Sequence, residues 1–265
     1  MRTICYNIKL YRYGKILIEG EKFYSMETFL FYLDFSIYMG KTLIQKLKLE
    51  KLKKHGTEEE VRQYINETVE EWSNHVLNKV HANIEVLGKE NITEKTCLYV
   101  SNHQGNFDIP IFLNIFHEPV GFIAKKELLK FKTFSYWMKQ INCIFIDRNN
   151  IRDSMKAMNE GVEILKRGHS MVIFPEGTRS KGPKVGEFKK GSMKLALKAG
   201  VPVVPVTIDG SYKLLERNSE YDKSKRKVTI TIEKPIYPKE LSKEQQNSLA
   251  EDVKKIIINN IKSST

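Results

Sequence analysis

Apolar residues recur at two different periods along the chain. Between residues 58 and 81 they follow one another at spacings of three and four, which is the period of a helix with one buried face. Just before this run, Thr57 and Glu60 have the spacing of a capping box, a common helix start. The apolar positions are Val61, Ile65, Val69, Trp72, Val76 and Val80. The pattern predicts one long amphipathic helix over about 58–81.

Beyond residue 81, short apolar runs rich in β-branched residues predict strands. They are IEVLG from residue 84, CLYVSN from 97, GFIA from 121, CIFI from 143, MVIF from 171, VVPVTI from 203 and KVTITIE from 227. Helical patterns alternate with them at about 151–165, at 192–200 and from about 242 onward. Ser242 and Gln245 open the last of these in capping-box spacing. The alternation predicts an α/β fold, a mixed central sheet covered by helices.

The part of the chain before residue 58 has a different character. Residues 29–40 are rich in aromatic and aliphatic side chains, and the sequence KTLIQKLKLEKLKK follows, with six lysines and one glutamate. Asp34 and these lysines leave the stretch short of the roughly 20 apolar residues that a membrane-spanning helix needs. An aromatic helix followed by a basic amphipathic segment is instead typical of the headgroup layer of an anionic membrane.

We therefore expect an N-terminal amphipathic helical region, residues 1–81, that interacts with an anionic membrane surface, ahead of an α/β domain over residues 82–265. In this interpretation Phe31 and Phe35 are exposed and insert into the membrane interface. The alternative is a surface helix packed on the core, because basic amphipathic patterns also occur on such helices. A chain of 265 residues with 41% hydrophobic residues is large enough to bury a full core.

The charge of the chain indicates what kind of partner it binds, and its cysteine content indicates in which compartment it is located. The formal charge of +12 favours an anionic partner: nucleic acid, anionic lipid or a phosphorylated substrate. No RNP, helix-turn-helix or zinc-finger pattern is present, so nucleic acid is not expected. Cys5, Cys97 and Cys143 are too few and too scattered for a disulfide framework, and Lys and Arg interrupt every apolar run of the N-terminal segment. We expect a peripheral or monotopic protein at the cytoplasmic face of the cell membrane.

The sequence NHQGNFD, residues 102–108, directly follows a predicted strand. On a straight helix His103 and Asp108 would point about 140° apart, but the Gly-Asn pair between them favours a turn. Asp108 can then cap a helix with Pro110 in its first turn, and its carboxylate can meet the imidazole. An Asp that fixes one ring nitrogen leaves the other free to accept a proton, as in a general base. The alternative is a histidine that only satisfies loop carbonyls.

The sequence FPEGTRS, residues 174–180, also follows a predicted strand. Gly177 permits close backbone approach, Thr178 offers a hydroxyl and Arg179 a forked cation, which together suit a phosphate group. A solvated turn between sheet and helix is the alternative. Lys125 after GFIA and Arg148 in CIFIDR place two more cations at strand ends, where an open α/β sheet usually binds its ligand.

In this order, NHQGNFD, CIFIDR, FPEGTRS and VPVVPV resemble the four sequence blocks of the glycerolipid acyltransferase family, which includes bacterial 1-acylglycerol-3-phosphate acyltransferases. The resemblance covers about residues 97–208. It implies that His103 deprotonates an acceptor hydroxyl as that hydroxyl attacks an acyl thioester, while Asp108 orients His103. It also implies a set of residues that bind the acceptor: Lys125, Arg148, Glu176, Gly177, Thr178 and Arg179. The VPVVPV block would shape the apolar side of the site.

The implied reaction moves a fatty acyl group from acyl carrier protein or coenzyme A to the sn-2 hydroxyl of 1-acylglycerol 3-phosphate, and forms phosphatidic acid. No cofactor and no metal is implied. We expect Lys125 or the Gly177 amide to stabilise the oxyanion, and direct transfer, because no Ser or Cys stands in a nucleophile elbow. The family often has a small hydroxyl residue at the position of Gln104 or Gly105, so this loop differs in detail.

Two other functions stay open at this point. One is an acyltransferase for another glycerolipid acceptor, such as glycerol 3-phosphate or a lysophospholipid with a larger headgroup, because a set of cations favours a phosphate monoester without defining the rest of the molecule. The other is a catalytically silent lipid-binding relative, which the intact His103 and Asp108 pair disfavours.

Overall fold

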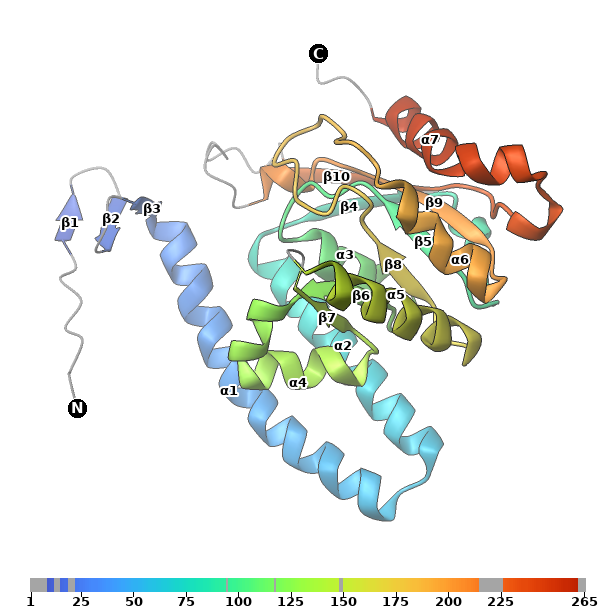
Figure 1. The fold of residues 1–265 in the computed structure, drawn as a ribbon. Helices are drawn as coiled ribbons and strands as arrows, with labels where there is room; N and C mark the ends of the chain where they lie inside the picture. Colours follow the sequence, from blue (N-terminus) through green and yellow to red (C-terminus); the bar gives the residue numbers. More distant parts are fainter. Residues whose placement is uncertain are drawn as a thin grey trace.

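The structure is a computed structural model that describes residues 9–11, 15–18, 22–93, 95–116, 118–147, 150–214 and 226–261. Its centre is a seven-stranded sheet in the order β4-β10-β9-β5-β8-β6-β7 (Figure 1). The strands are β4 (Asn83–Leu87), β5 (Leu98–Ser101), β6 (Gly121–Lys125), β7 (Ile144–Ile146), β8 (Met171–Ile173), β9 (Val203–Asp209) and β10 (Lys227–Ile232). Each lies on one of the predicted apolar runs, so the strand predictions are confirmed.

The sheet is mixed, as predicted. Strand β10 is parallel to β4 and antiparallel to β9. The neighbours β9, β5, β8, β6 and β7 all run parallel. The carboxyl ends of these five strands therefore lie at one edge of the sheet.

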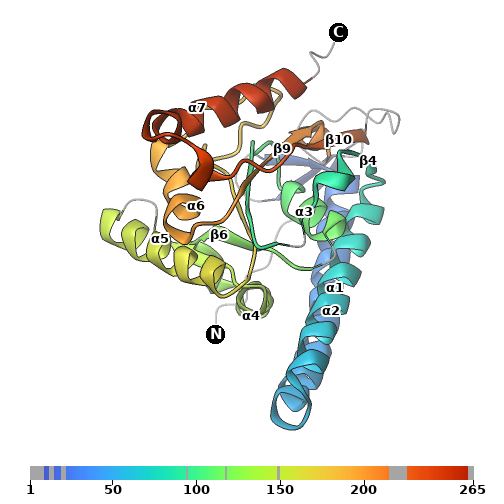
Figure 2. The ribbon, with the colours of Figure 1, turned by 90° about the vertical axis from the view of Figure 1, so that its right-hand side faces the viewer.

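Helices cover both faces of the sheet, which gives an α/β/α arrangement (Figure 2). One face packs against α2 (Glu58–Lys79) and α3 (Asp108–Ile115), and the other against α5 (Ile151–Lys166), α6 (Lys194–Ala199) and α7 (Lys243–Asn260). Side chains of β5 alternate between the two cores: Tyr99 faces α2 and α3, while Leu98 and Val100 face α5 to α7. Both predicted capping boxes are present, at the starts of α2 and α7.

Two features of the fold differ from the predictions. The N-terminal region was expected to be helical throughout, but β1 (Lys9–Tyr11), β2 (Lys15–Ile18) and β3 (Lys22–Ser25) form a small antiparallel sheet, and the helix begins only at Met26. Aromatic and β-branched residues in these segments suit strands. Helix α4 (Lys132–Gln140) was not predicted, since no side chain caps its start. The division of the chain at residue 81 stays a prediction.

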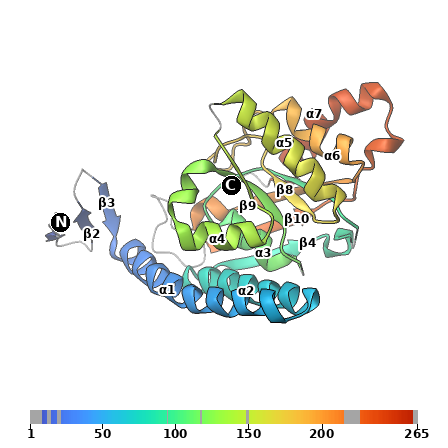
Figure 3. The same cartoon turned by 60° about the horizontal axis from the view of Figure 1, so that its bottom comes forward.

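Helix α1 (Met26–His55) is one continuous helix that lies antiparallel to α2 and beside α4 (Figures 1 and 3). Asp34 on α1 connects it to α2 through His75 Nε2 at 2.6 Å and Lys79 Nζ at 2.7 Å. Burial raises the pKa of Asp34, but these two hydrogen bonds and charges outweigh it and leave the pKa below its usual value. Tyr38 stacks on the His75 ring at 4.2 Å. Polar and aromatic contacts thus hold the two helices together.

The two faces of α1 have different environments. Phe31 and Phe35 are half-buried and pack against the core, Phe31 against Phe107 and Phe35 against Phe134, with ring centroids 5.7 and 6.4 Å apart. The expectation that these two rings are exposed is therefore wrong. Five of the exposed apolar residues lie on another face, at spacings of three, four, seven and three: Leu30, Leu33, Ile37, Ile44 and Leu47. We call these five residues the α1 stripe.

No helix in the part of the chain that the structure describes is both long and apolar enough to span a bilayer.

Replacing Phe31 or Phe35 by Ser should destabilise the fold, because each ring packs against the core. We expect each substitution to cost about 1–3 kcal/mol, less than the loss of a fully buried Phe. Urea unfolding followed by circular dichroism measures this. Ile37→Ser is the control, since Ile37 is 70% exposed and its loss should change the free energy of unfolding little. Equal stability of all three variants would show that the rings are not part of the core.

Candidate active site

The candidate site lies at the edge of the sheet where the parallel strands end. His103 follows β5, Glu176 follows β8, Lys125 ends β6 and Ser211 follows β9. Strand β5 lies between β9 and β8, so the loop that carries His103 has a neighbouring strand end on each side. The topology therefore brings together residues that are up to about 110 positions apart in the sequence, as in other open α/β sheets.

His103 and Asp108 are in contact. Nδ1 of His103 lies 2.6 Å from Oδ2 of Asp108, and the same oxygen accepts hydrogen bonds from the amides of Gln104 and Gly105 at 2.7 and 3.0 Å. Asp108 is fully buried and is the first residue of α3, with Pro110 in the first turn as predicted. Its carboxylate accepts from the loop before the helix, whereas we had expected it to cap the helix itself. The turn between the two residues is thus closed by the carboxylate.

The His103 ring is held on several sides. It stacks on Phe174 with ring centroids 4.2 Å apart and planes 16° apart. Its backbone amide donates to Oε1 of Glu176 at 2.7 Å, and its carbonyl accepts from the amide of Ser180 at 2.8 Å. Because Asp108 only accepts, the proton of a neutral imidazole lies on Nδ1 and Nε2 carries the lone pair. Among the described residues, none forms a hydrogen bond with Nε2. The arrangement suits a general base.

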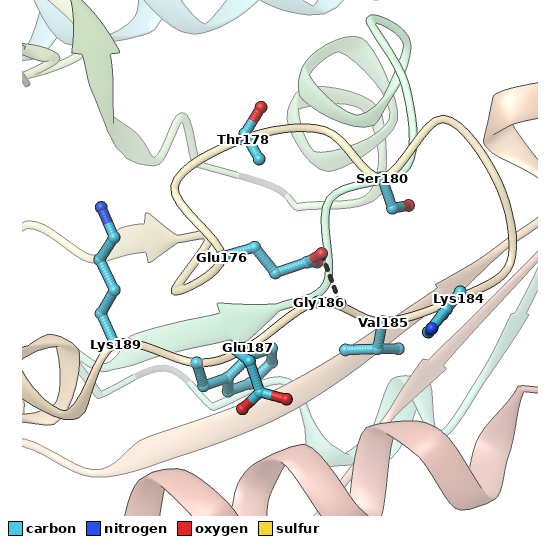
Figure 4. A pocket seen from close by; sticks show the side chains of 9 residues that line it. Glu176, Thr178, Ser180, Lys184, Val185, Gly186, Glu187 and Lys189 are labelled. Atoms are coloured by element: carbon cyan, nitrogen blue, oxygen red, sulfur yellow. Dashed lines mark hydrogen bonds between the residues drawn. The ribbon is translucent and has the colours of Figure 1, made fainter.

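Glu176 connects the two loops of the site. Oε1 accepts from His103 and Oε2 accepts from the amide of Gly186 at 2.8 Å (Figure 4). Burial raises the pKa of Glu176, and the two backbone amides oppose this rise only in part. The resemblance implied that Glu176 binds the acceptor, which stays a prediction. The contacts show that its carboxylate holds the position of His103.

Gly177 begins the second loop with a φ of +69°, which a residue with a side chain adopts only under strain. Its amide donates to the carbonyl of Phe174 at 3.0 Å. This amide is therefore engaged in the turn. The expectation that it donates to an oxyanion is wrong. Lys125, which is exposed at the end of β6, remains the predicted donor.

The other predicted residues lie in different surroundings. Thr178 is exposed, while Arg179 is half-buried and its Nη1 donates to the side chain of Asn106 in the first loop. Arg148 lies outside the described residues. Arg179 thus lies beside the loop that carries His103, and its predicted contact with the acceptor phosphate is untested.

A cavity of about 490 Å³ lies against the second loop (Figure 4). Glu176, Thr178, Ser180, Val185 and Gly186 are among the residues that line it, together with Lys184 and Lys189. The one other acidic residue of its lining, Glu187, pairs with Lys254 at 2.8 Å. The lining therefore combines hydroxyl groups, two lysines and two carboxylates with the apolar side chains of Val185 and Phe188.

The cysteines of the described chain do not offer a nucleophile. Burial raises the pKa of Cys97 to about 11 and that of Cys143 to about 12, so both remain thiols near neutral pH. Within the same described residues, no three His, Cys, Asp or Glu side chains are placed to hold a metal ion.

Sequence reasoning missed several residues that build the site. The side-chain amide of Asn102 donates to the carbonyl of Ile208 at 2.8 Å and accepts from its amide at 2.9 Å, which joins the ends of β5 and β9. Ser211 donates to Oδ1 of Asp108, and Phe174 packs on His103. One signal was available for Ser211: it directly follows Gly210 at the end of a predicted strand, the position from which the other site residues were inferred.

The fold and the sequence together define an acyltransferase domain. Residues 83–209 match the family model described as Acyltransferase. Over 181 residues, 64% of this chain, the sequence is 34% identical to a probable 1-acyl-sn-glycerol-3-phosphate acyltransferase of Mycoplasma pneumoniae and covers 68% of it. It is 40% identical to the enzyme of that name from Pseudomonas aeruginosa over 133 residues, which is 49% of this chain and 51% of the relative.

The chain belongs to the 1-acyl-sn-glycerol-3-phosphate acyltransferase family. The crystal structure of PlsC, the 1-acyl-sn-glycerophosphate acyltransferase of Thermotoga maritima, has a similar fold, with a TM-score of 0.72 and 28% identity over 89% of this chain and 94% of that one. Several curated relatives are matched over only about half of their length, as in Brassica napus at 50% and Pseudomonas aeruginosa at 51%. The α/β fold is thereby confirmed, and the roles of the site residues stay predictions.

Replacing Glu176 by Gln should weaken both the fold and the site. Each carboxylate oxygen of Glu176 accepts from one backbone N–H. In Gln, an NH₂ group replaces one of these oxygens and cannot accept, so one backbone N–H loses its partner, which costs about 1–3 kcal/mol. We expect a lower midpoint of unfolding and slower acyl transfer. Glu163→Gln is the matched control, since Glu163 on α5 and its partner Lys166 are 61% and 49% exposed and such a surface ion pair contributes little. Wild-type behaviour of Glu176→Gln would contradict the proposed connection between the loops.

Proposed function

We propose that this protein transfers a fatty acyl group from a thioester to the sn-2 hydroxyl of 1-acylglycerol 3-phosphate and so forms phosphatidic acid. The observation that carries the proposal is the contact between Nδ1 of His103 and the buried carboxylate of Asp108, with Nε2 directed to no described partner. The names of the relatives from Mycoplasma pneumoniae and Pseudomonas aeruginosa support the same acceptor.

In the proposed reaction, Nε2 of His103 takes the proton of the acceptor hydroxyl as its oxygen attacks the thioester carbonyl. A carbon–oxygen bond forms, the carbonyl oxygen becomes an oxyanion, and Lys125 is the proposed donor to it. When the intermediate collapses, the carbon–sulfur bond breaks and His103 returns the proton to the departing thiolate. Asp108 stabilises the imidazolium that exists between these two steps. No covalent acyl-enzyme forms.

The acceptor phosphate is proposed to lie against the cations at the strand ends, Lys125, Arg148 and Arg179, and beside Thr178. Arg179 supports this assignment because its contact with Asn106 keeps a guanidinium next to the loop of His103. The acyl donor is acyl carrier protein or coenzyme A, and no further cofactor takes part.

The protein is proposed to work as a peripheral protein on an anionic membrane, at its cytoplasmic face. The support is the α1 stripe, five aliphatic side chains that are 48–71% exposed on one helix with a lysine-rich second half. Transferring such half-exposed side chains into an apolar interface stabilises binding by about 1 kcal/mol each, and the lysines add attraction to anionic lipids. Phe31, on another face of the same helix, contacts Phe107 next to Asp108, so a docked α1 would hold the site close to its lipid substrate.

An acyltransferase for another glycerolipid acceptor is the second candidate, because exposed cations recognise the phosphate and leave the rest of the acceptor unspecified. A panel of glycerol 3-phosphate, 1-acylglycerol 3-phosphate and lysophosphatidylcholine separates these acceptors. Phosphatidic acid as the main product supports the proposal, and a preference for another acceptor overturns it.

His103→Ala should reduce acyl transfer by at least about 100-fold without unfolding the protein, because it removes the general base. The assay follows free thiol and phosphatidic acid together in mixed micelles, with acyl carrier protein and coenzyme A thioesters as donors. The chain offers a matched control in His75, whose Nε2 also lies 2.6 Å from an aspartate, Asp34, but between α1 and α2.

His75→Ala should therefore retain turnover. Full activity of His103→Ala, or an acyl adduct trapped on the protein, would contradict the proposed mechanism. Absence of transfer by the wild type with every donor would favour a silent lipid-binding relative.

Substituting Leu33, Ile37 and Ile44 together by Ser should weaken binding to vesicles of phosphatidylglycerol and phosphatidylcholine by at least about tenfold, because it removes three exposed aliphatic side chains from the α1 stripe. Cosedimentation measures the binding. The control replaces Met155 and Ile258, which are 63% and 45% exposed on other helices, by Ser. Equal binding of both variants would show that the α1 stripe does not face the membrane.

A further inference from the structure

The carboxylate of Asp108 has two oxygens, and they have different partners. Oδ2 accepts from His103 Nδ1 and from the amides of Gln104 and Gly105. Oδ1 accepts from the hydroxyl of Ser211. Asp108 and Ser211 are both fully buried, so water does not replace this hydrogen bond. Within the described residues, Ser211 is the donor that holds the second oxygen.

Ser211 comes from a segment 103 positions away from Asp108, and the sheet brings the two together. Strands β5 and β9 are parallel neighbours with Ser101 opposite Val206. Ser211 begins a short 3₁₀ helix, Ser211–Lys213, directly beyond the end of β9. It therefore lies beside the loop that follows β5.

The backbone around Ser211 is fixed by the His103 loop itself. The amide of Gly210 donates to Oε1 of Gln104 at 2.9 Å. Gly210 has a φ of +107°, and a side chain there would also collide with the carbonyl of Lys227 at 2.4 Å. A Cβ atom on Gly105 would lie only 3.2 Å from the carbonyl oxygen of Ser211. The two segments are thus in direct contact, and the Ser211 hydroxyl has a defined position.

We propose that Ser211 is a positioning residue for the acyl transfer: it fixes the plane of the Asp108 carboxylate so that Oδ2 faces Nδ1 of His103. This inference rests on the proposed function. The terminal torsion of an Asp side chain is broad. The three donors on Oδ2 restrict this torsion, and the Ser211 hydroxyl on Oδ1 restricts it further from the opposite side. Ser211 touches no reacting atom in this role and acts through Asp108 and His103.

The kinetic test compares Ser211→Ala with the wild type. We expect kcat to fall by about 10- to 100-fold with KM for both substrates unchanged, because a small misplacement of the base slows chemistry without affecting binding. Ser211→Cys keeps the shape but donates weakly, so its kcat should lie between the two. Ser73→Ala is the matched control: Ser73 is equally buried in α2 and donates to the carbonyl of Glu70 at 2.9 Å, remote from the site.

The second readout does not depend on turnover. The proton between Nδ1 of His103 and Asp108 should give a downfield proton resonance in the wild type, correlated to the ring nitrogen after ¹⁵N labelling of histidine. We expect Ser211→Ala to shift this resonance upfield or broaden it, Ser211→Cys to shift it less, and Ser73→Ala to leave it in place. Circular dichroism confirms that each variant is folded.

An unchanged resonance and unchanged kcat in Ser211→Ala would overturn the proposal. A Ser211→Cys variant identical to the wild type in both readouts, beside an impaired alanine variant, would overturn it too, since packing would then explain the effect. If Ser211→Ala does not fold, Ser211→Cys decides alone, with reduced kcat and a shifted resonance as the supporting result. A shifted resonance in a protein without acyl transfer would support the positioning role and reject the proposed function.

Discussion

The buried negative charge of Asp108 is the constraint on which the site depends. A carboxylate removed from water is stable only when hydrogen-bond donors surround it, and here they come from the loop after β5, from the imidazole and from the turn after β9. Moving any one of these segments would remove part of this set of donors and leave the buried charge less well satisfied. The same requirement that stabilises the carboxylate therefore fixes the ring that it orients.

A second carboxylate, Glu176, extends this constraint to β8. Its two oxygens hold the amide of His103 on one side and that of Gly186 on the other. Glu176 therefore holds the backbone of His103, while Phe174 stacks on its imidazole ring. Both parts of the residue are fixed in position. The segments that follow three neighbouring strands, β9, β5 and β8, thus contribute one hydroxyl or carboxylate each to a single histidine environment, and the strand order brings these segments together.

The sequence allowed the sheet and much of the site to be predicted, because β-branched runs, capping boxes and strand-end residues are local signals. Where the outcome depended on a distant partner, prediction failed. The aromatic residues of α1 are visible in the sequence, but which face is covered depends on Phe107 and Phe134. Helix α4 lacks a capping side chain, so its start carries no local signal. The role of Ser211 requires knowing that β9 lies beside β5.

The hydrogen bond from Gly186 to Glu176 has a consequence for how this enzyme family can diversify. This hydrogen bond holds together the two ends of the loop formed by residues 177–185, whatever the loop contains. Closing a longer loop costs little extra entropy, since the cost rises only with the logarithm of its length. Insertions and substitutions within the loop can therefore reshape the cavity that it borders while the two ends of the loop, and the amide of His103 that Glu176 holds, keep their places.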